Sequence, residues 1–238
     1  PGAVELGDFD ATSTTIAGDP GGELGRLPQP ALNHTFERYN EFFRQRRTEA
    51  QWNNYTPYEW RGGGTMVRLG WRDRALEQMA FFMEGQRPPT WNHWAEVVWR
   101  DPKTPRFIGD MPHTWVGSDF IRAARSLFVF EREADQALVI GAGLPAAWVE
   151  SPQGVTVRRM PTWHGTLNYR LAMAGPDALR ARLTGDVTVP PGRIILHSPL
   201  DRPVRAATVN GRAATFTANT VTVDQFPAEV ELHYATAP

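Results

Sequence analysis

The period of the hydrophobic pattern changes near Ala134, and this change constrains the fold of the 238-residue chain more than any other feature. Upstream of it, apolar residues recur at spacings of three and four, which places them on one face of a helix. The clearest such stripe, within residues 31–47, consists of Leu32, Phe36, Tyr39, Phe42 and Phe43. Downstream, short alternating segments such as WVE, GVTVRRM and AEVELHY predict strands, and the Asn-Gly pair at 210–211 predicts a tight turn. The sequence therefore predicts an α+β multidomain protein, with helices in residues 1–136 and an antiparallel β-sandwich in residues 137–238.

Three further helices are expected in the first part. Residues 66–69 suggest a short helix, and a stronger stripe on residues 76–83 ends before Gly85, a residue type common just after helices. A long helix is expected from residue 115 to about 131. The glycines at 62–64 are interpreted as the end of a non-periodic connection.

Composition excludes several functional classes. The formal net charge of -1 and the pI near 6.7 provide no basic field for nucleic acid and no polybasic segment for an anionic membrane. Because the chain has no cysteine, it has no disulfide, thiolate nucleophile or cysteine-ligated metal. No transmembrane run and no nucleotide or zinc motif is found, so no cofactor is predicted. Lys103 is the single lysine, and this preference for arginine is typical of a GC-rich bacterial genome.

The segment from Thr90 to Phe120 concentrates large aromatic and polar side chains in one turn-rich connection. It contains Trp91, Trp94, Trp99, Trp115, His93, His113 and Glu96. Indoles stack on the apolar faces of sugar rings, while carboxylate and imidazole bind hydroxyl groups, so the segment suits a glycan subsite. Tryptophan-rich loops also act as packing plugs between helix ends, and residue types alone leave these two interpretations equally open.

Two earlier loops carry side chains of similar types. In QWNNYTPYEWRGGG these are Trp52, Tyr58, Glu59, Trp60 and Arg61. In GDFDATSTT, Asp8 and Asp10 precede a hydroxyl cluster, where helix capping is favoured over contact with sugar hydroxyls. Since helices alternate with such loops, one end of a helical array is expected to hold the chemistry.

The segments WNHWAEVV and GDMPHTWVGSDFI, preceded by QWNNYTPYEW, resemble the C-terminal part of six-hairpin glycosidases. Glucoamylases, trehalases and α-L-rhamnosidases share this (α/α)6 toroid, which a β-sandwich often accompanies. The resemblance implies an inverting glycoside hydrolase acting on an oligo- or polysaccharide, with Glu96 as general base. It also implies sugar contacts for Tyr58, Glu59, Trp60 and Arg61, and a hydrogen-bonding role for His113. One departure is Asn53, which stands where the trehalase pattern has aspartate.

The resemblance implies that half of the catalytic pair lies outside this chain. An inverting glycosidase needs a general acid as well as a base, and the family's acid would lie upstream of Pro1. We therefore expect an upstream segment or a second chain to supply the acid and the remaining helices. It would cover apolar faces that include Phe36, Phe42, Met79 and Phe128. A periplasmic or secreted location is favoured over a cytoplasmic one.

Two other classes of function stay open. A polysaccharide lyase or epimerase on the same toroid would use His93, His113 and Tyr58 to move protons. A non-catalytic glycan-binding or structural module would leave Glu96 as a surface or helix-capping acid. Because Trp148 and Trp163 are the only indoles after residue 136, the β part is interpreted as a stabilising companion rather than a binding strip.

Overall fold

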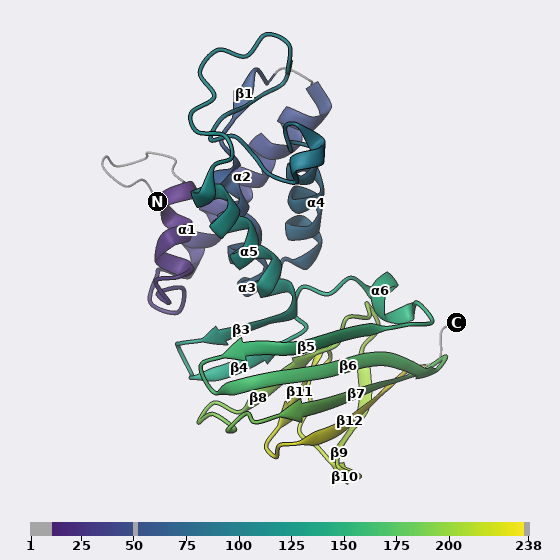
Figure 1. Ribbon diagram of the computed structural model, residues 1–238. Helices are drawn as coiled ribbons and strands as arrows, with labels where there is room; N and C mark the ends of the chain where they lie inside the picture. Colours follow the sequence, from purple (N-terminus) through teal and green to yellow (C-terminus); the bar gives the residue numbers. More distant parts are fainter. Residues whose placement is uncertain (1–10, 50–51, 236–238) are drawn as a thin grey trace. The chain divides into compact units, whose positions relative to one another are not determined.

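The computed structural model describes residues 11–49 and 52–235, and the chain divides into two compact units, Pro1–Ser126 and Leu127–Pro238. The first unit is helical and the second is built of strands, so the α+β class is confirmed (Figure 1). The described helices do not close into a ring. No described helix is long and apolar enough to span a membrane.

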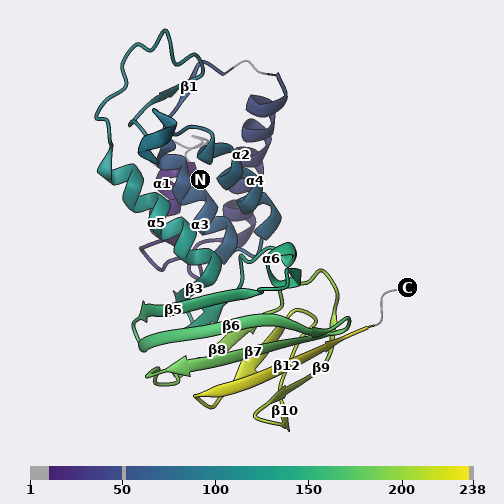
Figure 2. The ribbon, with the colours of Figure 1, turned by 45° about the vertical axis from the view of Figure 1, so that its right-hand side comes forward.

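Over residues 11–49 and 52–126, the first unit shows five α-helices and a short β-ribbon. The helices are α1 (Ala11–Gly18), α2 (Gln29–Glu49), α3 (Trp60–Arg68), α4 (Arg72–Met83) and α5 (Thr114–Phe128). The 3-10 turns η1 (Pro57–Glu59) and η2 (Pro89–Trp91) precede α3 and the long loop before α5. Strands β1 (Asn54–Tyr55) and β2 (Val98–Trp99) pair antiparallel. Figures 1 and 2 show β1 and that long loop together at one end of the helices.

The apolar stripe predicted for residues 31–47 forms the buried face of α2. Leu32, Phe36 and Phe43 are fully buried, whereas Phe42 is 45% exposed. Of the faces expected to lack neighbours, Phe36 and Met79 are in fact buried within the unit. That expectation was wrong for these two residues, and the neighbour of Met79 is α3, at Gly63.

The three glycines at 62–64 lie inside α3, so their interpretation as the end of a connection was wrong. All three are buried, and Gly63 and Gly64 allow α3 to pack closely against its neighbours. A Cβ on Gly63 would lie 2.8 Å from Cε of Met79, and one on Gly64 would lie 3.3 Å from Oδ2 of Asp19. Close packing therefore outweighs the low helix propensity of glycine.

The long helix α5 ends at Phe128, three residues before the predicted end. Val129–Arg132 forms β3 instead and pairs antiparallel with β4 (Ala137–Ile140). Its first residues, Val129 and Phe130, are buried β-branched and aromatic side chains, which favour a strand. The first strand of the second unit thus begins at residue 129, ahead of the boundary expected at 136/137.

The second unit contains two sheets that share one core. The six-stranded sheet has the order β10-β9-β12-β7-β6-β5 and is antiparallel throughout. The four-stranded sheet has the order β11-β8-β4-β3. Buried side chains from both sheets, among them Leu138, Leu171, Leu183 and Val221, form a single cluster. The remaining bounds are β5 (Val155–Thr162), β6 (Gly165–Gly175), β7 (Ala178–Gly185), β8 (Ile194–His197), β9 (Val204–Val209), β10 (Arg212–Ala213), β11 (Thr220–Val223) and β12 (Ala228–Tyr234).

Two predictions for this unit need correction and one is confirmed. Strands β4 and β8 pair parallel, whereas β3 and β11 on their outer sides pair antiparallel with them. The tripeptide WVE belongs to the short helix α6 (Ala146–Glu150), which follows Pro145. The turn at Asn210–Gly211 joins β9 to β10 with positive φ at both residues, as a tight hairpin turn requires.

Candidate functional site

A hydrogen bond between Tyr58 and His113 brings two distant loops together. Tyr58 lies in η1, and His113 stands directly before the first residue of α5. The phenol oxygen lies 2.5 Å from Nε2 of His113. Thr56 links the segment of Tyr58 to that of Glu96. Its hydroxyl accepts from the backbone N–H of Tyr58 and donates to the backbone carbonyl of Glu96, 3.1 Å away. Residues 56–58 are thereby fixed to the loop that carries Glu96.

The electrostatic surroundings keep the phenol of this pair protonated. Burial and then the negative charge of Glu96 raise the pKa of Tyr58, so its phenol stays protonated at neutral pH. A protonated phenol can donate to Nε2, and in that arrangement a neutral His113 ring carries its proton on Nδ1. Nδ1 faces Oδ2 of Asp110 at 3.7 Å, where a protonated ring would find a counterion. The three side chains form a series along which a proton can be relocated.

Arg61 fixes the other side of the Tyr58 ring. Its guanidinium carbon lies 4.7 Å from the ring centroid, and its Nε donates to Oδ2 of Asp119 at 2.7 Å. Asp119 is almost fully buried, and burial raises the pKa of its carboxyl although Arg61 lowers it. Because its guanidinium group both lies over the Tyr58 ring and binds the Asp119 carboxylate, Arg61 positions Tyr58.

The loop before α5 is shaped around the side chain of Glu96. Gly109 has a φ of +63°, and a Cβ on this residue would collide with Oε2 of Glu96. The backbone N–H of Glu96 donates to the carbonyl of Asp110 at 3.2 Å. Glycine is therefore required at 109 both for its backbone conformation and for the space that the carboxylate occupies.

The four tryptophans proposed as sugar contacts in this region fall into two groups. Trp60 and Trp94 are each 1% exposed, their ring centroids are 5.3 Å apart, and Nε1 of Trp94 donates to the carbonyl of Phe82. These two form the packing plug that was the alternative interpretation. Trp91 and Trp115 are 58% and 65% exposed, and Trp115 lies with its ring centroid 5.9 Å from that of Tyr58. Only the second pair offers an indole face to a ligand.

His93 is held between its own backbone and α5. Its Nδ1 accepts from the N–H of Trp94 at 2.9 Å. Its Nε2 faces Gly117, where a Cβ would come within 2.9 Å of that nitrogen. The ring is half-buried and packs between Trp94 and the first turns of α5.

Other predicted contact residues belong to the interior of the unit. Glu59 is 8% exposed and accepts from both terminal nitrogens of Arg46, at 2.9 and 3.0 Å, and from Tyr39 at 2.5 Å. Trp52 makes edge contacts with Tyr55 and Phe81 in an aromatic cluster. Both side chains are engaged in packing. The predictions for Asp8 and Asp10 lie outside the described residues.

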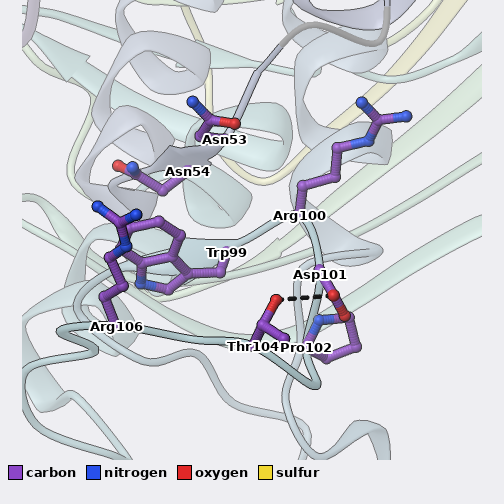
Figure 3. A pocket seen from close by; sticks show the side chains of 8 residues that line it. All are labelled: Asn53, Asn54, Trp99, Arg100, Asp101, Pro102, Thr104 and Arg106. Carbon is purple, nitrogen blue, oxygen red and sulfur yellow. Dashed lines mark hydrogen bonds between the residues drawn. The ribbon is translucent and has the colours of Figure 1, made fainter.

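A separate polar groove of about 690 Å³ lies along the β1–β2 ribbon (Figure 3). Asn53, Asn54, Trp99, Arg100 and Arg106 contribute to its lining. Among them, the sequence singled out only Trp99 as part of the aromatic segment and Asn53 as a departure from the trehalase pattern. The signal that could have revealed the groove is WRDPKTPR, in which arginines flank a turn. No cluster of three or more His, Asp or Glu side chains suited to a metal occurs within residues 11–49 and 52–235.

Comparison with known proteins yields little. No family model matches the chain, and no curated protein sequence matches it. Among solved structures, a GH127 β-L-arabinofuranosidase from Geobacillus stearothermophilus T6 is 13% identical, with a TM-score of 0.33. The match covers 75% of this chain and 30% of that enzyme. Similarity at this level defines neither the fold nor the function of the chain.

Proposed function

We propose that the helical unit carries part of the active site of a glycoside hydrolase acting on an oligo- or polysaccharide. The observation that supports this proposal most is that Thr56 ties the backbone of Glu96 to the segment of Tyr58, whose phenol is hydrogen-bonded to His113 and lies against the exposed Trp115. A carboxylate, a proton-relaying pair and an open indole face are the groups that a sugar ring and an attacking water need.

In this proposal Glu96 is the general base of an inverting reaction. It removes a proton from water while a general acid protonates the leaving oxygen, and the two carboxyls stand roughly 6.5–9.5 Å apart to admit the water. Tyr58 and His113 orient the water or a sugar hydroxyl, and Trp115 stacks on the ring. The (α/α)6 toroid is part of the proposal, and a further polypeptide segment supplies its remaining helices and the general acid.

Exposed apolar side chains on two helices support the need for that segment. Phe42 on α2 is 45% exposed, and Ile121 on α5 is 66% exposed. Large aliphatic and aromatic side chains in that state mark surfaces that another element covers. Phe36 and Met79 no longer contribute to this argument, because the unit itself buries them.

The test is Glu96→Gln in the complete enzyme, assayed with aryl glycosides and polysaccharides. Loss of a general base lowers turnover about 10²–10⁴-fold, and the folded state should remain intact. The matched control is Glu37→Gln, an exposed position on α2, which should leave turnover unchanged. Near-normal hydrolysis by Glu96→Gln would remove Glu96 from the mechanism.

The 2.5 Å hydrogen bond between Tyr58 and His113 favours one second candidate, a lyase or epimerase. There His113 abstracts the proton next to a carboxyl group, and Tyr58, protonated because its pKa is raised, serves as the acid. A lyase leaves an unsaturated sugar that absorbs in the ultraviolet, whereas a hydrolase does not. Tyr58→Phe should abolish that product if the second candidate is correct, and Glu96→Gln should spare it.

A further inference from the structure

The polar groove along the β1–β2 ribbon has a preorganised floor. Asn54 pairs with Trp99 across the ribbon, and the N–H of Arg100 donates to the carbonyl of Asn53 at 2.8 Å. The indole N–H of Trp99 donates to the carbonyl of Phe107 at 2.7 Å. Because the polar edge of Trp99 is satisfied in this way, its ring is held in place along the groove.

The groove carries an excess of positive charge that nearby side chains do not neutralise. Arg100 and Arg106 are exposed, and neither forms an ion pair with any residue the structure describes. Asp101 also lines the groove, but its carboxylate accepts from the N–H of Lys103 at 2.9 Å and the hydroxyl of Thr104 at 2.7 Å. Two guanidinium groups against one carboxylate give the lining a formal charge of +1, on a chain whose net charge is -1.

Short stretches of backbone join the groove to the candidate active site. Trp99 follows Glu96 by three residues, which span at most about 10 Å. Asn54 and Asn53 likewise stand two and three residues before Thr56, which binds the carbonyl of Glu96. A saccharide chain with one unit beside Glu96 can therefore place a neighbouring unit in the groove.

We propose that this groove is a subsite for an anionic sugar unit, so that the substrate is an acidic oligo- or polysaccharide. The proposal rests on the glycan-active site proposed above and specifies its substrate class. In Figure 3, Arg100 and Arg106 extend from the two chain segments that border the groove, with Trp99 and the two asparagines along it. Guanidinium groups bind carboxylate or sulfate in a forked geometry, Trp99 packs against the sugar ring, and the amides of Asn53 and Asn54 bind its hydroxyl groups.

The experiment measures binding to the full chain by calorimetry. The probes are an oligosaccharide of uronic acids, the same oligosaccharide after reduction of its carboxyl groups, and a sulfated oligosaccharide. We expect the uronic or the sulfated probe to bind more tightly than the neutral one, and that preference to weaken as salt is added. Whichever of the two binds more tightly identifies the anionic group that the subsite takes.

The variant Arg100→Gln/Arg106→Gln should weaken binding of the anionic probe at least tenfold and leave the neutral probe unaffected. The matched control Arg205→Gln removes an exposed arginine from β9 and should change neither. Circular dichroism verifies that each variant is folded. Equal binding of charged and neutral probes, no binding of either anionic probe, or unchanged anionic binding in the double variant would overturn the proposal. Turnover by Glu96→Gln is a separate readout, so the failure of the proposed function is distinguishable from that of the subsite.

Discussion

Glu59→Gln should destabilise the helical unit strongly, although the substitution changes only one atom of the side chain. The carboxylate holds three hydrogen bonds in the interior, two from Arg46 and one from Tyr39. A glutamine keeps the volume of the side chain but removes its charge. It also places an N–H₂ group opposite a donor, so the two hydrogen bonds from Arg46 cannot both persist.

The magnitude follows from how much of the ion pair is buried. Removing one partner of a buried pair costs about 3–5 kcal/mol, because the remaining charge loses its compensation. The side chain of Arg46 is 17% exposed against 8% for that of Glu59, so water offsets part of the loss and we expect about 3 kcal/mol. Tyr39→Phe removes one hydrogen bond to a charged group and should cost about 1.5–3 kcal/mol.

Tryptophan fluorescence during urea unfolding measures this loss, because seven of the nine tryptophans lie in residues 1–126. The matched control is Glu41→Gln, an exposed position on the same helix as Arg46, and its effect should stay within about 0.5 kcal/mol. Should Glu59→Gln lose no more stability than Glu41→Gln, the network does not stabilise the fold. The earlier prediction that Glu59 contacts the sugar would then stand again.

Three further predictions use the same reasoning. In α3, Gly62→Ala should stabilise the unit by about 0.5–1 kcal/mol, because the nearest atom to the new Cβ is 3.5 Å away. Gly64→Ala should destabilise the unit, because its Cβ would meet atoms at 3.3 and 3.4 Å. Thermal unfolding of the two variants measures the difference. Gly109→Ala should lower turnover with little change in circular dichroism, because its Cβ displaces the carboxylate of Glu96. Burial raises the pKa of all five tyrosines, so the stability linked to them is complete below pH of about 10 and is lost as pH rises further. Ultraviolet titration should show tyrosinate appearing together with unfolding. Reversible ionisation of the tyrosines at a pH of about 10 in the folded protein would contradict this.

The parts of the fold that the sequence predicted well depend on local patterns. The stripe of α2 spans several turns, so the side chains that it buries could be identified without knowing their partners. The turn at Asn210–Gly211 has a backbone requirement that few other residue pairs meet. Both features follow from residues close in sequence, which is why no knowledge of the tertiary structure was needed.

The failures arise where a distant neighbour decides the conformation. Residues 129–132 continue a helical pattern, but the partner strand β4 makes them a strand. The glycines at 62–64 are typical of a loop, and only the side chains of Met79 and Asp19 show why α3 needs Gly63 and Gly64. Glu59 resembled a ligand-binding acid for the same reason, because its partner Arg46 stands 13 residues earlier in another helix.

The candidate site shows how a two-residue ribbon determines which side chains meet. Two loops carry the polar aromatic residues, and the sequence placed both at one end of the helices without giving their register. Pairing of Tyr55 with Val98 fixes that register, and the bond from Thr56 to the carbonyl of Glu96 extends it by one step. Shifting the ribbon by one residue would turn Trp99 away from the groove and break the hydrogen bond from Thr56 to the carbonyl of Glu96. The groove and the carboxylate therefore depend on the same backbone pairing, which is the physical reason for treating them as parts of one binding surface.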